Sequence, residues 1–286
     1  MELISKEMPA DYEIYDTGDL HIGVANCNEE AIVEMVDDIA SKPDRYIILK
    51  GDLIDSIPLS DKRFAVTSFK GRRVTTPQDQ SNRAMEILKP IKDRILFIQL
   101  GNHEYKLINT VDFVGDWCKA FNVPWGGIMA KFIHLSAGKP QWKGLFCHGN
   151  GSINTVAKDP IQGLANMKAL LKRKLQYLAG DTIVMSMGHT HKLLRCKPTI
   201  QNQLTMTDDG EKLLQSYRVD TDQSASYIDV EARWYVNTGS FLKTMSDPGE
   251  GLIPYSEVAM YGPIEQGYCK IIVKDHKVCT VERVTV

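Results

Sequence analysis

Short apolar runs recur along the first two thirds of the chain, and each ends in a glycine or a polar turn. Runs of this length, rich in branched aliphatic residues, are typical of strands buried on both faces of a sheet. Four are clear and the first is weaker, and they occupy residues 13–15, 45–49, 94–100, 144–146 and 182–187. We therefore expect a sheet whose strands carry turns at their carboxyl ends.

Helical signals lie between these runs. Acidic first turns, Asn or Thr before the first turn, and Pro or Gly beyond the last one mark helix boundaries. They predict helices over residues 31–40, 77–88, 110–121 and 161–178. The last has an apolar stripe from Leu164 to Leu178, which is typical of core packing. The alternation of strands and helices predicts an α/β fold.

The pattern changes to β after residue 191. Strands are predicted over residues 226–230, 233–236, 269–273 and 278–281, the last two paired across a short turn. The polar stretch 199–223 reads as an insertion or a mobile loop.

Each of the five apolar runs is followed by a polar cluster, and together the five clusters hold five of the seven histidines. In order they are Asp19-Leu20-His21, Gly51-Asp52-Leu53-Ile54-Asp55, Gly101-Asn102-His103-Glu104, Cys147-His148-Gly149-Asn150 and Gly188-His189-Thr190-His191. Carboxylate, amide and imidazole ligands together suit two divalent cations about 3.5–4 Å apart. Strand carboxyl ends meet at one edge of an open α/β sheet, so these residues are expected to converge.

Together the clusters resemble the calcineurin-like metallophosphoesterase superfamily, whose pattern is D-x-H, G-D-x-x-D, G-N-H-E, a lone H and G-H-x-H. All five blocks occur in order over residues 19–191. The resemblance implies a two-sheet β-sandwich flanked by helices. No cut within 19–191 leaves a complete site, so we expect one domain over 1–286, with a β-rich C-terminal part, 192–286.

The same resemblance implies two sets of metal ligands that share one carboxylate, Asp52. The first metal would be held by Asp19, His21, Asp52 and His191, and the second by Asp52, Asn102, His148 and His189. The mixed oxygen and nitrogen ligands suit two divalent transition ions, with manganese favoured and iron or zinc possible. A water or hydroxide bridging both ions would be the nucleophile.

His103 is interpreted as the proton donor to the leaving oxygen, and Asp55 resembles the carboxylate that orients it. Glu104 is expected to make a structural hydrogen bond. Simpler roles exist for some of these residues: Asp19 and Asp55 as helix caps, and His148, taken alone, as a core histidine. A scaffold that keeps the fold without chemistry is a further alternative, but every ligand position and His103 are present.

Composition and net charge limit the partners and the cellular compartment that we expect for this chain. The net charge of −2 shows no general nucleic-acid signature, so any such binding must come from a local patch. Six scattered cysteines without a C-x-x-C pair suggest reduced thiols. The first residues lack the apolar core of a signal peptide, and no run approaches the ~20 apolar residues of a membrane span. We expect a cytoplasmic protein without a membrane partner, or one in the host cytoplasm if viral; oligomeric state is not indicated.

Substrate class follows less directly. Ser56 follows G-D-x-x-D where protein Ser/Thr phosphatases have Arg, which disfavours phosphoproteins. Residues 61–73 carry five basic residues and one acid, and among them Arg72 and Arg73 could guide a phosphate-rich substrate; a merely solvated loop is the alternative. We predict a phosphodiesterase of nucleotides or nucleic acid, with a phosphomonoesterase or a non-catalytic metal-bound scaffold as alternatives. Aromatic residues that could stack on a base are Phe64, Phe69, Tyr105 and Trp125.

Overall fold

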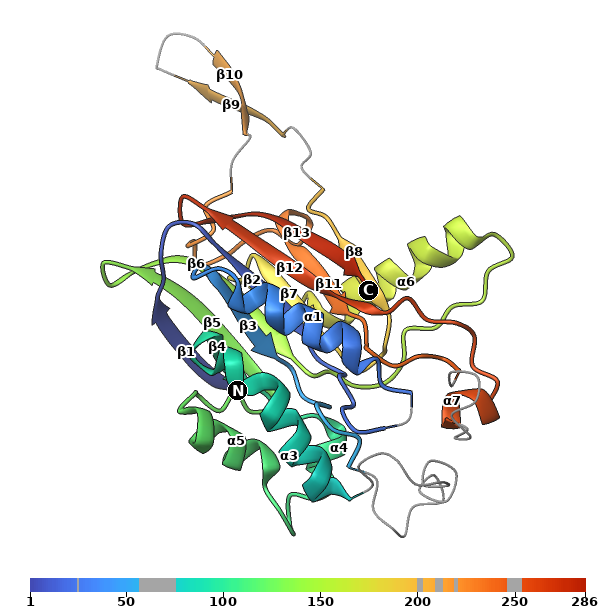
Figure 1. Ribbon diagram of the computed structural model, residues 1–286. Helices are drawn as coiled ribbons and strands as arrows, with labels where there is room; N and C mark the ends of the chain where they lie inside the picture. Colours follow the sequence, from blue (N-terminus) through green and yellow to red (C-terminus); the bar gives the residue numbers. More distant parts are fainter. Residues whose placement is uncertain (25, 57–75, 200–202, 209–212, 219–220, 246–253) are drawn as a thin grey trace.

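Two β-sheets face each other, and helices cover both outer faces (Figure 1). The computed structural model describes residues 1–24, 26–56, 76–199, 203–208, 213–218, 221–245 and 254–286. The first sheet has strand order β1-β5-β6-β7-β11-β8 and the second β13-β12-β2-β3-β4. This arrangement confirms the predicted two-sheet α/β sandwich.

The six strands of the first sheet are mixed in direction, but β6, β7 and β11 run parallel. They are β1 (Glu2–Glu7), β5 (Met129–Ser136), β6 (Lys139–Cys147), β7 (Val184–Met187), β8 (Leu193–Cys196) and β11 (Trp234–Thr238).

In the second sheet β2, β3 and β4 run parallel, and β12 adds to β2 antiparallel. Its strands are β2 (Tyr12–Thr17), β3 (Arg45–Leu49), β4 (Ile95–Ile98), β12 (Gly267–Lys274) and β13 (Lys277–Thr285). The C-terminal β-hairpin therefore completes the sheet that the N-terminal strands begin.

Burial on both faces explains the continuous apolar runs. In β3, Ile47 and Leu49 pack under the helices, whereas Ile48 points into the layer between the sheets. The same cluster includes Phe97 of the neighbouring strand β4 and, from the facing sheet, Phe132 and Phe146. A strand with no solvent face cannot alternate polar with apolar residues, so its sequence reads as a run.

The outer face of the second sheet is covered by α1 (Glu29–Ala40), α3 (Pro77–Leu88) and α5 (Phe113–Phe121), and that of the first by α6 (Pro160–Leu175) (Figure 1). Shorter helical segments are the 3₁₀ turns Lys89–Arg94 and Val230–Ala232, α4 (Asn102–Tyr105) and α7 (Tyr255–Val258). Asn28 and Thr76 cap α1 and α3, which confirms the first two predicted helices.

Three helix boundaries differ from the sequence prediction by two residues or more, and the first is the start of α1, at Glu29 and not at residue 31. The third helix begins at Phe113 and not near residue 110, because Asp112 accepts a hydrogen bond from the Gly115 amide at 2.9 Å and so supplies the cap. The fourth ends at Leu175, and Leu178, predicted on its stripe, is 43% exposed.

In the C-terminal part the strand predicted over residues 226–230 is wrong, and the stretch 199–223, predicted as an insertion or a mobile loop, contains strands. Residues 226–230 form no strand, because the Ile228 amide donates to the Gly180 carbonyl (2.9 Å) and its own carbonyl accepts from Arg233. The stretch 199–223 contains the antiparallel hairpin of β9 (Gln203–Asp208) and β10 (Leu213–Arg218), which projects from the sandwich in Figure 1.

Among the described residues, none of the helices combines the length and the apolar character that crossing a bilayer requires.

Candidate metal centre

Five strands deliver the predicted ligands to one end of the sandwich. Asp19 and His21 follow β2, Asp52 follows β3 and Asn102 follows β4. From the facing sheet, His148 follows β6, and His189 and His191 follow β7. Because these strands are parallel within each sheet, their carboxyl ends share one edge.

The turns after β2, β3 and β4 contact one another through their backbones. The Asp19 amide donates to the Gly51 carbonyl and the His21 amide to the Asp52 carbonyl, both at 3.0 Å. A Cβ on Gly51 would lie 2.2 Å from the Gly101 nitrogen, and one on Gly101 would lie 2.1 Å from the Asp52 nitrogen. Only glycine allows this approach, which explains the glycines of the second and third motifs.

Five of the seven predicted ligands have left-handed backbone conformations. Their φ angles run from 49° to 67°, and they are Asp19, His21, Asp52, His189 and His191. Such conformations are uncommon for residues other than glycine and persist only where the surrounding structure imposes them. Their concentration here marks the edge as a functional site.

Asp19, His21 and His191 form the first group, whose ligand atoms lie within 4.8 Å of one another. The Nε2 atoms of His21 and His191 are 3.3 Å apart, and His191 Nε2 is 3.3 Å from Asp19 Oδ1. Asp19 Oδ1 is buried and has no hydrogen-bond donor among the described residues, whereas its Oδ2 accepts from the His189 amide at 2.7 Å. One carboxylate oxygen and two imidazole nitrogens thus face a common point.

Asp52, His148 and His189 form the second group. His148 Nε2 lies 3.3 Å from Asp52 Oδ2 and 2.8 Å from Asn102 Oδ1, and His189 Nδ1 lies 2.6 Å from the same amide oxygen. His148 Nδ1 donates to the Lys50 carbonyl at 2.8 Å, which turns Nε2 toward the site. Burial alone would lower the pKa of His148, but the Asp52 carboxylate raises it to about 9.

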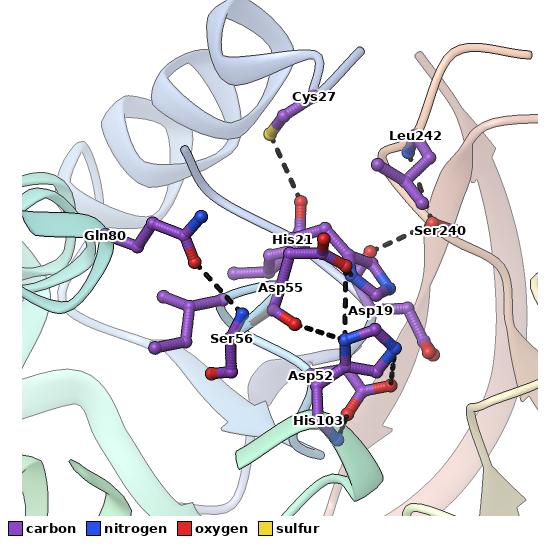
Figure 2. A network of polar contacts seen from close by, with 12 residues as sticks. Asp19, His21, Cys27, Asp52, Asp55, Ser56, Gln80, His103, Ser240 and Leu242 are labelled. Carbon is purple, nitrogen blue, oxygen red and sulfur yellow. Dashed lines mark hydrogen bonds and ion pairs between the residues drawn. The ribbon is translucent and has the colours of Figure 1, made fainter. Parts of the chain in front are cut away.

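Asp55 holds two imidazoles at once (Figure 2). Its Oδ1 lies 3.2 Å from His21 Nδ1 and 3.1 Å from His103 Nδ1. Burial favours the neutral acid, but hydrogen bonds from His103 and His21 hold the pKa of Asp55 well below its usual range. The contact with His103 was expected; the contact with His21, which directs His21 Nε2 toward His191, was not.

His103 is placed beside the second group without being part of it. Its amide donates to Asp52 Oδ1 at 2.8 Å, and its Nε2 is 4.0 Å from Asp52 Oδ2. Burial would lower the pKa of His103, but Asp55 and then Asp52 raise it to about 9.

Glu104 organises the turn after β3. Its carboxylate accepts from the amides of Asp52, Leu53 and Ile54 at 3.0, 2.7 and 3.2 Å. Burial and the nearby Asp52 raise the pKa of Glu104 to about 7. The expectation of a structural hydrogen bond is confirmed.

Lys50 and Asp16 form a buried ion pair between the two sheets, which the sequence did not predict. Lys50 Nζ lies 3.0 Å from Asp16 Oδ1 and donates to Ser186 Oγ at 2.5 Å, and Ser186 in turn donates to Asp16. All three residues are fully buried. A Lys and an Asp inside otherwise apolar strand segments were the available signal, because buried charges need partners.

A cavity of about 610 Å³ opens above the two groups. His21, Asp55, His103, His189 and His191 line it on the metal side. Another part of its lining comes from C-terminal residues, among them Leu242, Tyr261, Pro263 and Ile264.

The sequence analysis predicted none of these C-terminal lining residues. Tyr105 and Trp125 are exposed but do not line the cavity, and Arg72, Arg73, Phe64 and Phe69 lie outside the described residues.

The family model of the calcineurin-like phosphoesterases matches this chain over residues 14–221. The chain belongs to the calcineurin-like phosphoesterase family. It is therefore a metallophosphoesterase, a hydrolase of phosphoric esters, as the five motifs predicted. Comparison with curated protein sequences gives no match.

Solved structures include distant likenesses to this metallophosphoesterase. A dimetal phosphatase from Danio rerio is 9% identical, with 96% of this chain and 98% of that chain covered and a TM-score of 0.41. A metallophosphoesterase from Sphaerobacter thermophilus is 15% identical (95% and 88% covered, TM-score 0.34). A predicted phosphoesterase from Streptococcus pneumoniae TIGR4 is 12% identical (97% and 99% covered, TM-score 0.30).

Proposed function

We propose that this metallophosphoesterase hydrolyses a phosphodiester of a nucleotide or nucleic acid, using two divalent transition ions. Manganese is the favoured metal, with iron and zinc as alternatives, because the donors are carboxylate, amide oxygen and imidazole.

Two features of the site support a pair of cations. Imidazole nitrogens face each other at 3.3 Å twice, in His21 with His191 and in His148 with His189. Asp19 Oδ1 is buried without a donor among the described residues. A cation in each group would satisfy all these lone pairs, and a buried carboxylate without a partner is otherwise costly. Asp19, His21 and His191 would hold one ion, and Asn102, His148 and His189 the other, with Asp52 shared.

Bound metals would lower the pKa of a coordinated water and so supply the nucleophile. The chain's own residues position the rest. Asp55 fixes the rings of His21 and His103, Glu104 fixes the backbone of Asp52, and the Lys50 carbonyl orients His148. His103, outside both groups but on the cavity wall, would donate a proton to the leaving oxygen.

The nucleotide substrate is supported above all by the C-terminal residues that line the cavity. Tyr261 lines the cavity and is 57% exposed, with Pro263 and Ile264 beside it in the lining. An accessible aromatic ring next to apolar side chains suits a nucleobase, whose stacking on such a ring contributes about 1–3 kcal/mol. Lys192 lines the same cavity directly after His191 and would attract a phosphate.

The test compares diesters that carry a base with diesters that do not. Single-stranded DNA, RNA, cyclic nucleotides and dinucleoside polyphosphates would be assayed beside bis-p-nitrophenyl phosphate and a phosphomonoester, each with added manganese. Tyr261→Ala should raise KM for the preferred nucleotide about 5- to 150-fold, while Tyr261→Phe should leave it nearly unchanged. Preferential hydrolysis of monoesters would favour a phosphomonoesterase. Metal content without any hydrolysis would favour the non-catalytic scaffold.

A further inference from the structure

A second cavity, of about 400 Å³, lies between α6 and the edge strand β8. It shares no lining residue with the cavity above the metal centre. Its ionisable lining consists mainly of basic residues: Lys168 and Lys172 from α6, Arg195 and Lys197 from β8 and its end, and Arg233, with Glu231 as the acid. Five cations and one anion give 5 − 1 = +4 in a chain whose net charge is −2.

Glu231, the acid in the lining of this cavity, forms an ion pair with Lys172 and so neutralises one of the five positive charges. Lys168 and Lys197 have no acidic partner among the described residues. Two ammonium groups on the cavity wall therefore keep an attraction for an anion.

Arg233 places a buried positive charge in the lining of the cavity. It is 1% exposed, and its guanidinium donates to the carbonyls of Ile228, Gln176, Ala179 and Gly180, with no carboxylate partner among the described residues. These carbonyls satisfy its N–H groups but leave its full charge, which is permanent for Arg. A buried cation without a counter-ion favours an anion in the adjoining space.

Arg195 lines the cavity from β8, but its guanidinium is directed elsewhere. Leu194 and Cys196 on either side of it pack toward α6, whereas Arg195 Nη1 donates to the Val281 carbonyl of the second sheet at 2.6 Å. The attraction for an anion therefore rests on Lys168, Lys197 and Arg233.

We propose that this cavity is a second, non-catalytic binding site for phosphate groups. Its volume is within the range of small-ligand pockets, about 300–1,000 Å³. The same chemistry is offered by the phosphates of a free nucleotide and by a short stretch of nucleic-acid backbone. The site is independent of the hydrolysis proposed for the metal centre.

The experiment measures binding and not turnover. The metal-loaded full chain would be titrated, by fluorescence anisotropy, with a labelled methylene-bridged ATP analogue and with a labelled phosphorothioate single strand, at several salt concentrations. The test variant is Lys168→Ala/Lys197→Ala. The matched control is Lys42→Ala/Lys139→Ala, which removes equal charge from exposed positions outside both cavities.

The test variant should raise Kd for at least one ligand about tenfold or more, because each lost contact is charge-assisted; the control should change it less than about twofold. An effect confined to the ATP analogue identifies a nucleotide site. An effect confined to the single strand, with a salt slope reduced by about 1.4 for two contacts, identifies a backbone site. Equal changes in test and control, or no change in either, would overturn the proposal.

Two controls separate this outcome from others. Lys197 is exposed, so Lys197→Glu reverses a charge without disturbing packing and should weaken binding even if the double variant folds poorly. Hydrolysis of bis-p-nitrophenyl phosphate should stay unchanged in every variant. If the wild type binds these ligands at the second cavity but hydrolyses no diester, the proposed function fails while the second site stands.

Discussion

Replacing His103 by Ala separates proton donation from metal binding. His103 contacts Asp55 through Nδ1 and lies 4.0 Å from Asp52 through Nε2, so it borders the second group without completing it. The variant should keep both metals and the fold. A general acid typically contributes ~100- to 10,000-fold, so kcat for a nucleotide with a ribose leaving oxygen should fall by that factor, equivalent to about 2.7–5.5 kcal/mol.

The leaving group provides the internal control. Nitrophenolate departs without a proton, so the loss on bis-p-nitrophenyl phosphate should be much smaller than the loss on the nucleotide. The assay is kcat on both substrates, with metal content by mass spectrometry and stability by urea unfolding for each preparation. Equal losses on both substrates would refute proton donation. Loss of a metal would instead assign His103, with His21 and Asp55, to coordination, since those three also lie within 4.8 Å of one another.

Three further predictions concern other parts of the molecule. Asp52→Asn should bind less metal than the wild type, because the proposed shared carboxylate loses its charge; full occupancy of two ions by mass spectrometry would contradict this. Lys50→Met should lower the free energy of unfolding by about 3–5 kcal/mol by leaving the Asp16 charge buried and unpaired, and Lys50→Met/Asp16→Leu should recover much of it in urea titrations. Burial and then the charge of His276 lower the pKa of His134 to about 4. The unfolded chain therefore binds more protons between about pH 6.5 and 4, and the unfolding free energy should fall by about 2–3 kcal/mol across that window; His134→Gln should flatten this part of the pH profile.

The elements predicted best from the sequence are the strands that pack against apolar side chains on both faces. Residues 45–49 were predicted and observed as a strand with the same limits, because both faces of β3 pack against apolar layers. Residues 226–230 include Tyr227, Ile228 and Val230 but form no strand. There the Arg233 guanidinium donates a hydrogen bond to the Ile228 carbonyl, a contact that the periodicity of the sequence does not reveal. Side-chain capture of backbone groups overrides a weak strand preference.

The same limit applies to the site. The residues of the two groups could be named from spacing and resemblance because each follows a strand directly. The wall that includes Tyr261 could not, because it comes from a segment about 70 residues beyond the last motif, and neither its composition nor its spacing marks it. Similarly, Asp55 was expected to contact one histidine and contacts two, since a single carboxylate oxygen can accept from two donors that only the fold brings together.

The position of Lys50 shows why the buried ion pair matters beyond stability. The proposed ligands come from two sheets, so the spacing between the sheets fixes the distance between the groups. Lys50 spans that spacing: its ammonium joins Asp16 of β2 to Ser186 of β7, and its carbonyl accepts from His148. Ser186 lies three residues before His189. A change in the Lys50 side chain therefore removes a link between the two sheets that carry the proposed ligands, and its effect on metal affinity should exceed that of an equally destabilising change elsewhere in the core.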